Sequence, residues 1–297
     1  MDCLTLARSK GMGLRIFWCD VTTSTRALEA RHLSGPAATQ VLGEALASVA
    51  LFSVDLTQEN ASVMLQLGVD GPVRGVIAEA TVEGSLRGFT YVKVLDEFDG
   101  RGKHSTAEVL GAAGKAVVTK SIPGRILSRG AVAAVPPEIR VVAARYLNDS
   151  VQTPAAVQVP VHVDAGGVVA AGGLVIELMP DGDRAGFFDR VELMNRATAP
   201  LAGKGLDAEG VADFLGIQDM TIDAERPLQF KCRCSRDRVQ DMLQMLPINE
   251  LREIEAAGEG QQLTCHMCGQ AYRLDSGQIA DVLRVRESED AHGEHEA

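Results

Sequence analysis

The sequence is poor in aromatic side chains and carries no excess of positive charge. Phe, Trp and Tyr make up 4% of the 297 residues, so the core has to be built from Val, Leu, Ile, Ala and Met. The formal net charge is -11. A protein whose main partner is a phosphate backbone usually has clustered Lys and Arg side chains, so this composition argues against a nucleic-acid partner.

Long hydrophobic runs and a leader segment are also missing. The most apolar stretch, VLGEALASVALFSVDL, is interrupted by Glu44, Ser48 and Asp55 and never reaches 18 uninterrupted apolar residues. This pattern favours a buried helix over a membrane span. The opening MDCLTLARSKGMG has no basic segment followed by an apolar run and a cleavage site, so we expect no secretory signal and a cytoplasmic location.

The common fingerprints of enzymes are absent as well. The chain has no P-loop, no nucleophile elbow and no dinucleotide-binding glycine pattern, because the GMG at Gly11 lacks a third glycine and precedes a strand. We therefore expect no catalytic residue and no enzymatic activity.

The first 180 residues alternate between strand and helix patterns. GLRIFWCDVTTS is typical of a strand, and GPAATQVLGEALASVALF has apolar residues at helical spacing. SVMLQLGV and VRGVIAEA predict a hairpin, and AAVQVPVHVDAGGVVAAGGLVIELMP predicts a second antiparallel meander. PPEIRVVAARYLNDS, between them, predicts a further helix. This order indicates an α+β fold with a mostly antiparallel sheet and packed helices.

Composition divides the chain into four expected parts. Residues 1–180 form an α+β core domain, and residues 181–229 form a linker whose segments FFDRVELMNRAT and LDAEGVADFLG predict short amphipathic helices. Residues 230–286 form a small cysteine-containing domain that PLQFKC enters as a strand. The acidic segment 287–297, with His292 and His295, is expected to be a disordered tail.

Four of the six cysteines stand in two tight pairs, KCRC and TCHMC, which predict a metal site. Zn²⁺ prefers a tetrahedron of thiolates, and a cysteine pair in one turn supplies two corners of it. Gly269 after the second pair suits the left-handed turn of a metal knuckle. The predicted ligands of one zinc ion are Cys232, Cys234, Cys265 and Cys268.

Other uses of these cysteines fit the sequence less well. Permanent structural disulfides are unusual in a protein without an export signal. A thioredoxin-like pair would begin a helix, whereas LTCHMCGQAYRL reads as strand, turn and strand. His266 lies inside the second pair, so the residue order needed for c-type haem attachment is absent. We expect His266 to be an exposed turn residue with no ligand role.

The segment between the pairs predicts two helices that fold around the metal. Ser235 and Asn249 are candidate N-caps, and Gly258 is a candidate helix end. A domain of this size has a small core, so zinc is expected to contribute on the order of 10 kcal/mol to its folding. Oxidation of the thiolates would release the metal and loosen these helices. Their apolar side chains would then be exposed and are candidates for binding client proteins, namely Val239, Met242, Leu243, Met245, Leu246, Leu251 and Ile254.

FKCRCSRDRVQDML followed by LTCHMCGQAYRL closely resembles the C-terminal signature of the thirty-three-kilodalton heat-shock protein family, which are redox-regulated bacterial holdase chaperones. LGEALASVALF, LQLGVDGPVRGVIAEA and AAGGLVIELMP resemble N-terminal segments of the same family. Ser150, Val151 and Gln152 before Pro154 depart from the family pattern, and residues 98–135 match poorly.

The resemblance implies a mechanism. An N-terminal domain for client binding and dimerisation precedes a linker and a zinc redox switch. Zinc leaves on oxidation as Cys232 bonds Cys234 and Cys265 bonds Cys268. The linker then unfolds, and a homodimer holds unfolding proteins without ATP. The alternative is a nucleic-acid-binding zinc ribbon. The segment between Ser235 and Thr264 contains six acidic residues and only three arginines, which argues against binding to a phosphate backbone.

Overall fold

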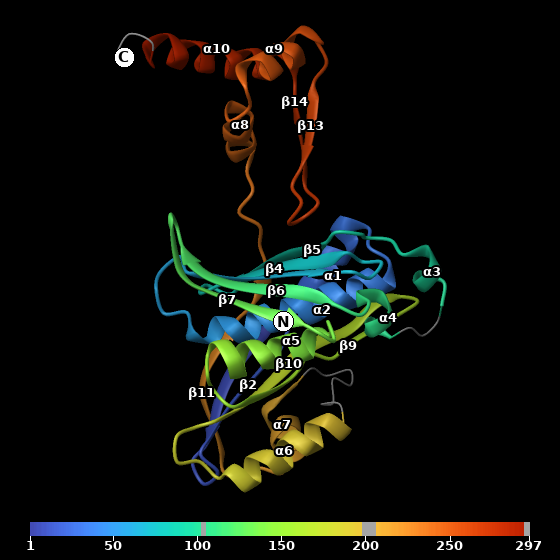
Figure 1. Cartoon of the computed structure of the whole chain (residues 1–297), viewed down its shortest axis with the longest axis vertical. Helices are drawn as coiled ribbons and strands as arrows, with labels where there is room; N and C mark the ends of the chain where they lie inside the picture. The colour runs from blue at the N-terminus through green and yellow to red at the C-terminus, as the bar shows by residue number, and fades with distance from the viewer. Residues whose placement is uncertain (102–104, 198–205, 294–297) are drawn as a thin grey trace. The chain divides into compact units, whose positions relative to one another are not determined.

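The computed structural model describes residues 1–101, 105–197 and 206–293 (Figure 1). The chain divides into two compact units, Met1–Lys231 and Cys232–Ala297, which we call unit 1 and unit 2. The expected linker, residues 181–229, is part of unit 1 in this division.

Unit 1 contains two six-stranded sheets. Sheet A has the order β11 (Met220–Pro227), β1 (Cys3–Ser9), β2 (Leu14–Asp20), β10 (Gly167–Leu178) and β8 (Ala155–Gln158), with β9 (Val161–Asp164) paired to β10. Sheet B has the order β12 (Gln229–Phe230), β5 (Ser85–Thr90), β4 (Gly75–Thr81), β3 (Ser62–Val69), β6 (Gly114–Ile122) and β7 (Arg125–Ala134). The pairings are antiparallel except between β12 and β5. The antiparallel α+β class is confirmed, but the strands form two sheets where the sequence predicted one.

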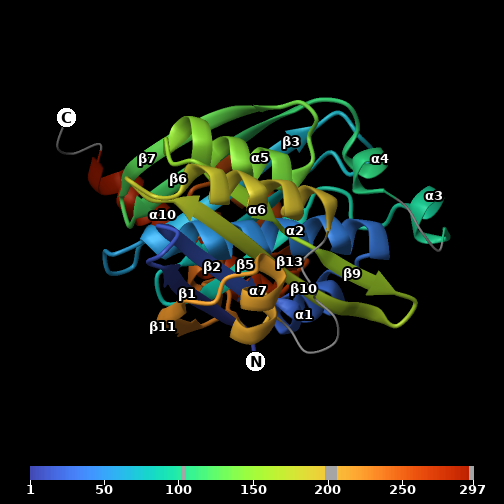
Figure 2. The ribbon, with the colours of Figure 1, turned by 90° about the horizontal axis from the view of Figure 1, so that it is seen from below.

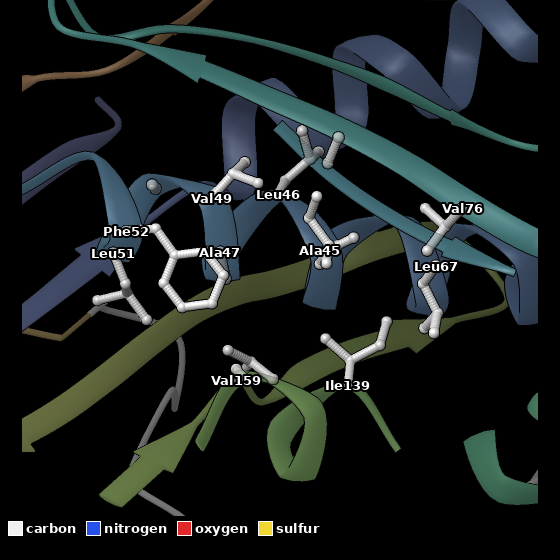
Figure 3. Close-up of a cluster of buried hydrophobic side chains, with 14 of the residues drawn as sticks. Ala45, Leu46, Ala47, Val49, Leu51, Phe52, Leu67, Val76, Ile139 and Val159 are labelled. Atoms are coloured by element: carbon white, nitrogen blue, oxygen red, sulfur yellow. The ribbon is translucent and has the colours of Figure 1, made fainter. Parts of the chain in front are cut away.

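Helix α2 (Pro36–Phe52) is buried on all sides, and one sheet could cover only one side of it. The second sheet covers another side. Fifteen of its 17 residues are buried, and its side chains pack against both sheets. Leu46 and Val49 lie in this core together with Leu67 of sheet B (Figure 3). The segment Pro36–Asp55 is long and apolar enough to cross a membrane, yet 89% of it is buried inside the structure, as in a core helix.

The central strands β2 and β10 of sheet A are apolar on both faces. Phe17 and Cys19 of β2 belong to the cluster around α2, whereas the alternate residues Ile16 and Trp18 belong to a second cluster. Helices α6 (Arg184–Arg196) and α7 (Ala208–Leu215) cover that second face (Figure 2). The Nε1–H of Trp18 donates to the Leu206 carbonyl oxygen at 3.0 Å. The two helices expected in the linker are therefore present and packed on sheet A.

The remaining helices of unit 1 are shorter. They are α1 (Thr22–His32), α3 (Asp96–Asp99), α4 (Thr106–Leu110), α5 (Ile139–Arg145), a 3-10 turn (Ser53–Asp55) and a π-helical turn (Tyr146–Ser150). The poorly matching segment 98–135 supplies α4 and the hairpin β6–β7. Strand β11 was not expected, although Met220, Ile222 and Ala224 alternate with polar residues in MTIDAERP. Its pairing with β1 holds it in the sheet.

Helix α1 receives its N-terminal cap from a distant residue. Its N-cap residue, Val21, makes no side-chain hydrogen bond, and Asp20 accepts from the N–H of Thr22 alone, at 2.8 Å. The buried carboxylate of Asp2 accepts hydrogen bonds from the backbone N–H groups of Thr23, at 2.8 Å, and Ser24, at 2.6 Å. Asp99 similarly accepts from the N–H of Ala37 at the start of α2. These contacts satisfy donors that helix ends leave unpaired.

Replacing Asp2 with alanine is expected to lower the free energy of unfolding of unit 1 by about 1 to 2 kcal/mol, the usual cost of a lost cap. Denaturant unfolding followed by far-ultraviolet circular dichroism measures this change. Asp2→Asn keeps one acceptor oxygen and should recover part of the loss. An unchanged unfolding midpoint in Asp2→Ala would contradict the assigned capping role.

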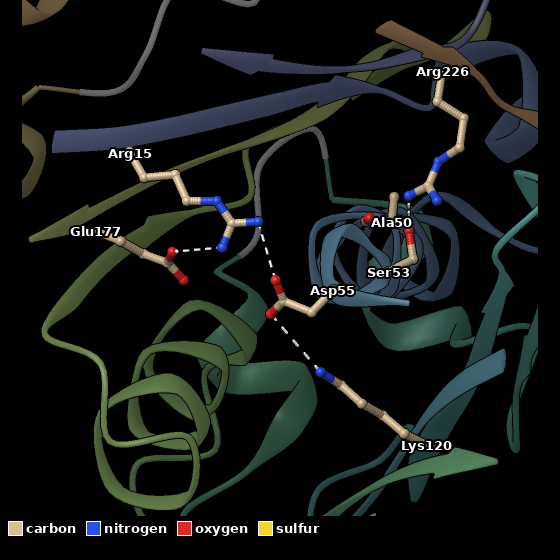
Figure 4. A network of polar contacts seen from close by, with 7 residues as sticks. All are labelled: Arg15, Ala50, Ser53, Asp55, Lys120, Glu177 and Arg226. Carbon is tan, nitrogen blue, oxygen red and sulfur yellow. Dashed lines mark hydrogen bonds and ion pairs between the residues drawn. The ribbon is translucent and has the colours of Figure 1, made fainter. Parts of the chain in front are cut away.

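Cations surround the C-terminal end of α2, where backbone carbonyls carry partial negative charge (Figure 4). Arg15 of β2 pairs with Glu177 at 3.2 Å and with Asp55 at 3.0 Å, and Lys120 of β6 approaches Asp55 at 3.9 Å. Arg226 of β11 donates to the Ser53 Oγ atom at 2.7 Å. Charged groups from both sheets thus meet at this end of the core helix.

Unit 2 has its own small core. It contains α8 (Arg236–Gln244), α9 (Ile248–Ala256), the antiparallel pair β13 (Gln261–Thr264) and β14 (Ala271–Leu274), and α10 (Ser276–Gly293). Ser235 caps α8 as predicted, with its Oγ accepting from the Arg238 N–H at 3.2 Å. The predicted cap at Asn249 is wrong, because α9 begins one residue earlier, after Pro247, whose fixed φ suits a helix start.

The acidic end of the chain also differs from the expectation. Residues 287–293 continue helix α10, whereas a disordered tail was expected from residue 287. Arg252 of α9 donates to the Glu287 carboxylate at 2.8 Å, which ties this part of α10 to the rest of unit 2. Residues 294–297, including His295, lie outside the described residues.

Candidate metal centre

The four predicted cysteines lie in two short segments of unit 2. Cys232 and Cys234 stand in the extended segment before α8. Cys265 and Cys268 stand in the turn between β13 and β14, so the expected strand, turn and strand are present. The fold therefore joins residues that are more than thirty positions apart in the sequence.

Their sulfur atoms form one compact cluster. All four Sγ atoms lie within 4.8 Å of one another. The Cys232 and Cys265 sulfurs are 3.8 Å apart, and the Cys234 and Cys268 sulfurs are 3.4 Å apart. A tetrahedron with Zn–S bonds of about 2.3 Å has edges of about 3.8 Å. The cluster thus has the size and the donor set that a zinc ion requires.

The turn that carries the second pair has the backbone of a metal knuckle. Gly269 has a φ of +71°, a left-handed conformation that favours glycine. The N–H of Gly269 donates to the Cys265 carbonyl oxygen at 2.8 Å, and the N–H of Cys265 donates to the Gln270 carbonyl oxygen at 2.9 Å. These bonds close the turn tightly, so both sulfurs are presented from one side of it.

The surroundings of this pair disfavour ionisation of both thiols. Burial raises the pKa of Cys265, and the nearby Cys232 adds to that increase. Burial also raises the pKa of Cys268. The backbone N–H groups of Met267 and Gln270 act in the opposite sense and lower the pKa of Cys265 and Cys268, respectively. A bound cation would displace the thiol protons, so metal affinity is expected to increase with pH.

Tyr272 of β14 contributes a contact that the sequence did not reveal. Its hydroxyl donates a hydrogen bond to the Cys234 sulfur at 3.1 Å, and this bond raises the pKa of Tyr272 to about 12. Hydrogen bonds of this kind orient metal ligands and stabilise a thiolate. The position carries no special motif, because a tyrosine in a strand normally indicates only a half-buried aromatic side chain.

Replacing Tyr272 with phenylalanine is expected to weaken metal binding about tenfold, since outer contacts of metal ligands typically contribute this much or more. Transfer of zinc to a chromophoric chelator measures both affinity and release rate. The matched control is Tyr91→Phe, which removes the hydroxyl of an exposed tyrosine in unit 1. Equal zinc transfer from the two variants would show that the hydrogen bond has no influence on the site.

The apolar side chains of unit 2 that were predicted to bind clients are partly buried in its core and partly exposed to solvent. Val239, Leu243 and Leu251 are buried in the core of unit 2, and Leu246 and Ile254 are partly buried against it. Met242 and Met245 are 58% and 76% exposed. The sequence interpretation missed three residues of this core in α10, namely Ile279, Val282 and Leu283. Their helical spacing could have indicated them.

His266 and the two remaining cysteines, Cys3 and Cys19, lie outside the cluster of four sulfur atoms. His266 is exposed in the turn and is not part of the cluster of possible ligands. Cys19 is fully buried in sheet A, where burial raises the pKa of its thiol, and Cys3 is partly buried at the start of β1. Cys19 therefore has the environment of a small apolar core residue.

Comparison with known proteins assigns the chain to a family. The family model described as Hsp33 protein matches residues 2–275. This chain belongs to the Hsp33 family. A protein named 33 kDa chaperonin from Symbiobacterium thermophilum is 35% identical over 95% of the Hsp33 chain and 97% of its own length. A second 33 kDa chaperonin, from a Cyanothece strain, is 30% identical over 95% of this chain and 96% of its own length.

A solved structure shows the same fold. The crystal structure of the 33 kDa chaperonin from Thermotoga maritima, a heat shock protein 33 homologue, superposes on the Hsp33 chain with a TM-score of 0.84. It is 23% identical and covers 96% of the Hsp33 chain and 99% of its own. The family resemblance read from the sequence is thereby confirmed, and membership of this family supports a chaperone function.

Proposed function

We propose that the Hsp33 chain is a redox-regulated, ATP-independent holdase of the cytoplasm that binds unfolding proteins during oxidative stress. The observation that carries this proposal is the placement of four thiols at one point. Cys232 and Cys234 lie where the chain enters unit 2, and Cys265 and Cys268 lie in its only described hairpin turn. A zinc ion held by all four, when bound, supplies a cross-link between these segments.

The small core of unit 2 explains why such a cross-link matters. Its fully packed apolar side chains are few, namely Val239, Leu243, Leu251, Leu274, Ile279, Val282 and Leu283. A core of this size rarely stabilises a domain by more than a few kcal/mol. The cysteine cross-link therefore carries much of the folding free energy of unit 2, and its removal would release the two helices between the pairs.

Oxidation of the cysteines would remove the cross-link. Each adjacent pair, Cys232 with Cys234 and Cys265 with Cys268, loses two electrons as its sulfurs join in a disulfide. Hydrogen peroxide accepts the two electrons with two protons and leaves as two water molecules. A disulfide sulfur is no longer a thiolate ligand, so two such bonds leave no donor for the metal. Neither bond connects the entering segment to the hairpin.

The released segment offers suitable surfaces for clients. Met242 and Met245 are already exposed, and the buried Val239, Leu243 and Leu251 would become accessible with the partly buried neighbours. Flexible methionine side chains adapt to varied apolar partners. We further propose that the oxidised form is a homodimer and that the linker, residues 181–229, unfolds with unit 2. No enzymatic activity is proposed, and the relatives are named chaperonins.

The test is an aggregation assay with a heat-labile client in the absence of ATP. Reduced, zinc-loaded protein should leave light scattering nearly unchanged, whereas peroxide-oxidised protein should suppress it at a ratio near one chain or dimer per client. Sedimentation of the two forms tests the dimer. Equal suppression by both forms would contradict redox regulation.

A nucleic-acid-binding zinc ribbon is the second candidate. The net charge of -11 and the six acids between Ser235 and Thr264 oppose it. Salt-dependent binding of single-stranded RNA by the reduced form would favour it over the holdase.

A further inference from the structure

A cavity of about 410 Å³ lies in unit 1, away from the cysteines. It is lined by residues of α2, α4, the start of α5, the connection between β8 and β9, and the end of α6. Its volume is within the range of sites for small molecules. Every lining residue belongs to residues 1–231, but residues 194–197 lie in the linker that is proposed to unfold on oxidation, so the cavity is complete only in the reduced form.

A buried acid lines the cavity. Glu44 projects from α2, the most apolar helix of the chain, and its side chain is only 8% exposed. Among the residues that the structure describes, no lysine, arginine or histidine forms an ion pair with it. Burial raises the pKa of Glu44 to about 8, while Gln40 and Thr106, which also line the cavity, lower it. The protein itself provides little positive charge to balance the negative charge of an ionised carboxylate in this position.

The other charged residues that line the cavity, Glu138, Arg140 and Arg196, are paired with carboxylates or guanidinium groups. Arg140 donates to Glu138 at 3.0 Å, and Arg196 pairs with Glu192 one turn earlier on α6. Glu138 raises the pKa of Glu44 and Arg140 lowers it, and both effects are smaller than that of burial. Both lining arginines are thus engaged with partners of their own, and an anion entering the cavity would meet Glu44.

The end of α6 adds partial negative charge. Gln158 of β8 donates from its Nε2 to the carbonyl oxygens of Met194 and Ala197, the latter at 2.7 Å. These bonds fix the C-terminus of a 13-residue helix at the cavity wall. The C-terminal end of a helix favours a positive charge nearby. This wall of the cavity therefore favours a cation over an anion.

We propose that this cavity is a binding site for an organic cation that carries a guanidinium or primary ammonium group, with Glu44 as its counter-ion. A guanidinium has several N–H donors in one plane, which match a carboxylate and neighbouring amide oxygens. A metal ion is a poorer match, because one carboxylate supplies too few hard oxygen ligands for calcium or magnesium. The cavity also leaves room for an alkyl chain on the cation.

Binding of butylguanidinium to the reduced full-length protein tests this proposal by calorimetry. This probe stays charged throughout the range used. About one-tenth of Glu44 is ionised at pH 7 and about nine-tenths at pH 9, so the affinity should rise about tenfold between them. Proton release at pH 7 should accompany binding. 1-Butanol and butyrate, which have the same chain without the positive charge, should not bind.

Two variants separate the site from general electrostatics. Glu44→Gln keeps the shape of the side chain and should lose binding at least tenfold at pH 9. Glu59→Gln removes the same charge from an exposed loop and should bind as the unmodified protein does. Absence of saturable butylguanidinium binding at pH 9, equal binding by Glu44→Gln, or preferential binding of butyrate would each overturn the proposal.

Discussion

Replacing Cys232 and Cys265 with serine is expected to abolish zinc binding and to unfold unit 2 under reducing conditions. One ligand is lost from each pair, and two thiols cannot hold a structural zinc ion in a closed tetrahedral site. Structural zinc contributes on the order of 10 kcal/mol to folding in comparable small domains. The remaining core of seven buried apolar side chains is too small to offset such a loss.

Hydrogen exchange measures this change directly. Amides of α8, α9 and the β13–β14 pair should lose their protection, and binding of a fluorescent apolar dye should increase without any oxidant. The control is Cys3→Ser, which removes a cysteine outside the cluster and should keep one zinc ion per chain. If the double variant were metal-free yet showed native protection and no new dye binding, zinc would not be the element that holds unit 2 together.

Replacing Glu44 with glutamine is expected to stabilise unit 1, increasingly so as the pH rises. The pKa of Glu44 is about 8 in the folded protein and near its ordinary value of 4.5 when unfolded. Between these values the unfolded state has lost the proton while the folded state keeps it, so native stability falls as the pH increases. The full cost, present above pH 8, is on the order of 5 kcal/mol. Glutamine does not ionise and avoids it.

Urea unfolding at pH 5 and at pH 9 provides the comparison. The unmodified protein and Glu44→Gln should differ little at pH 5 and most at pH 9, where the variant has the higher unfolding midpoint. Glu59→Gln should follow the unmodified protein at both values. A constant difference between Glu44→Gln and the unmodified protein would mean that Glu44 ionises normally in the folded chain.

The features that the sequence predicted well depend on neighbouring residues. Period-two alternation indicated β3 and β4, and the close spacing of Cys265 and Cys268 indicated the turn with Gly269. The meeting of the two cysteine pairs was also predictable, because a zinc ion needs four donors. Local chemistry in these cases is nearly sufficient to specify the structure.

The features that the sequence did not predict depend on contacts between distant segments. Asp2 caps a helix twenty residues away, and the strand Met220–Pro227 forms because β1 offers a free edge. The covering of α2 by two sheets follows from its burial on all sides, whereas the sequence pattern placed its apolar residues on a single helical face. Tyr272 was missed for the same reason, since its partner Cys234 is 38 residues earlier.

In the proposed mechanism, oxidation activates the chain by removing the metal that holds unit 2. Stepwise titration with peroxide, with zinc release, free thiols and client light scattering recorded on the same samples, tests it most directly. We expect the number of oxidised thiols, up to four, the released zinc, up to one ion per chain, and the suppression of scattering to increase together. Full suppression of client aggregation while zinc remains bound would contradict it.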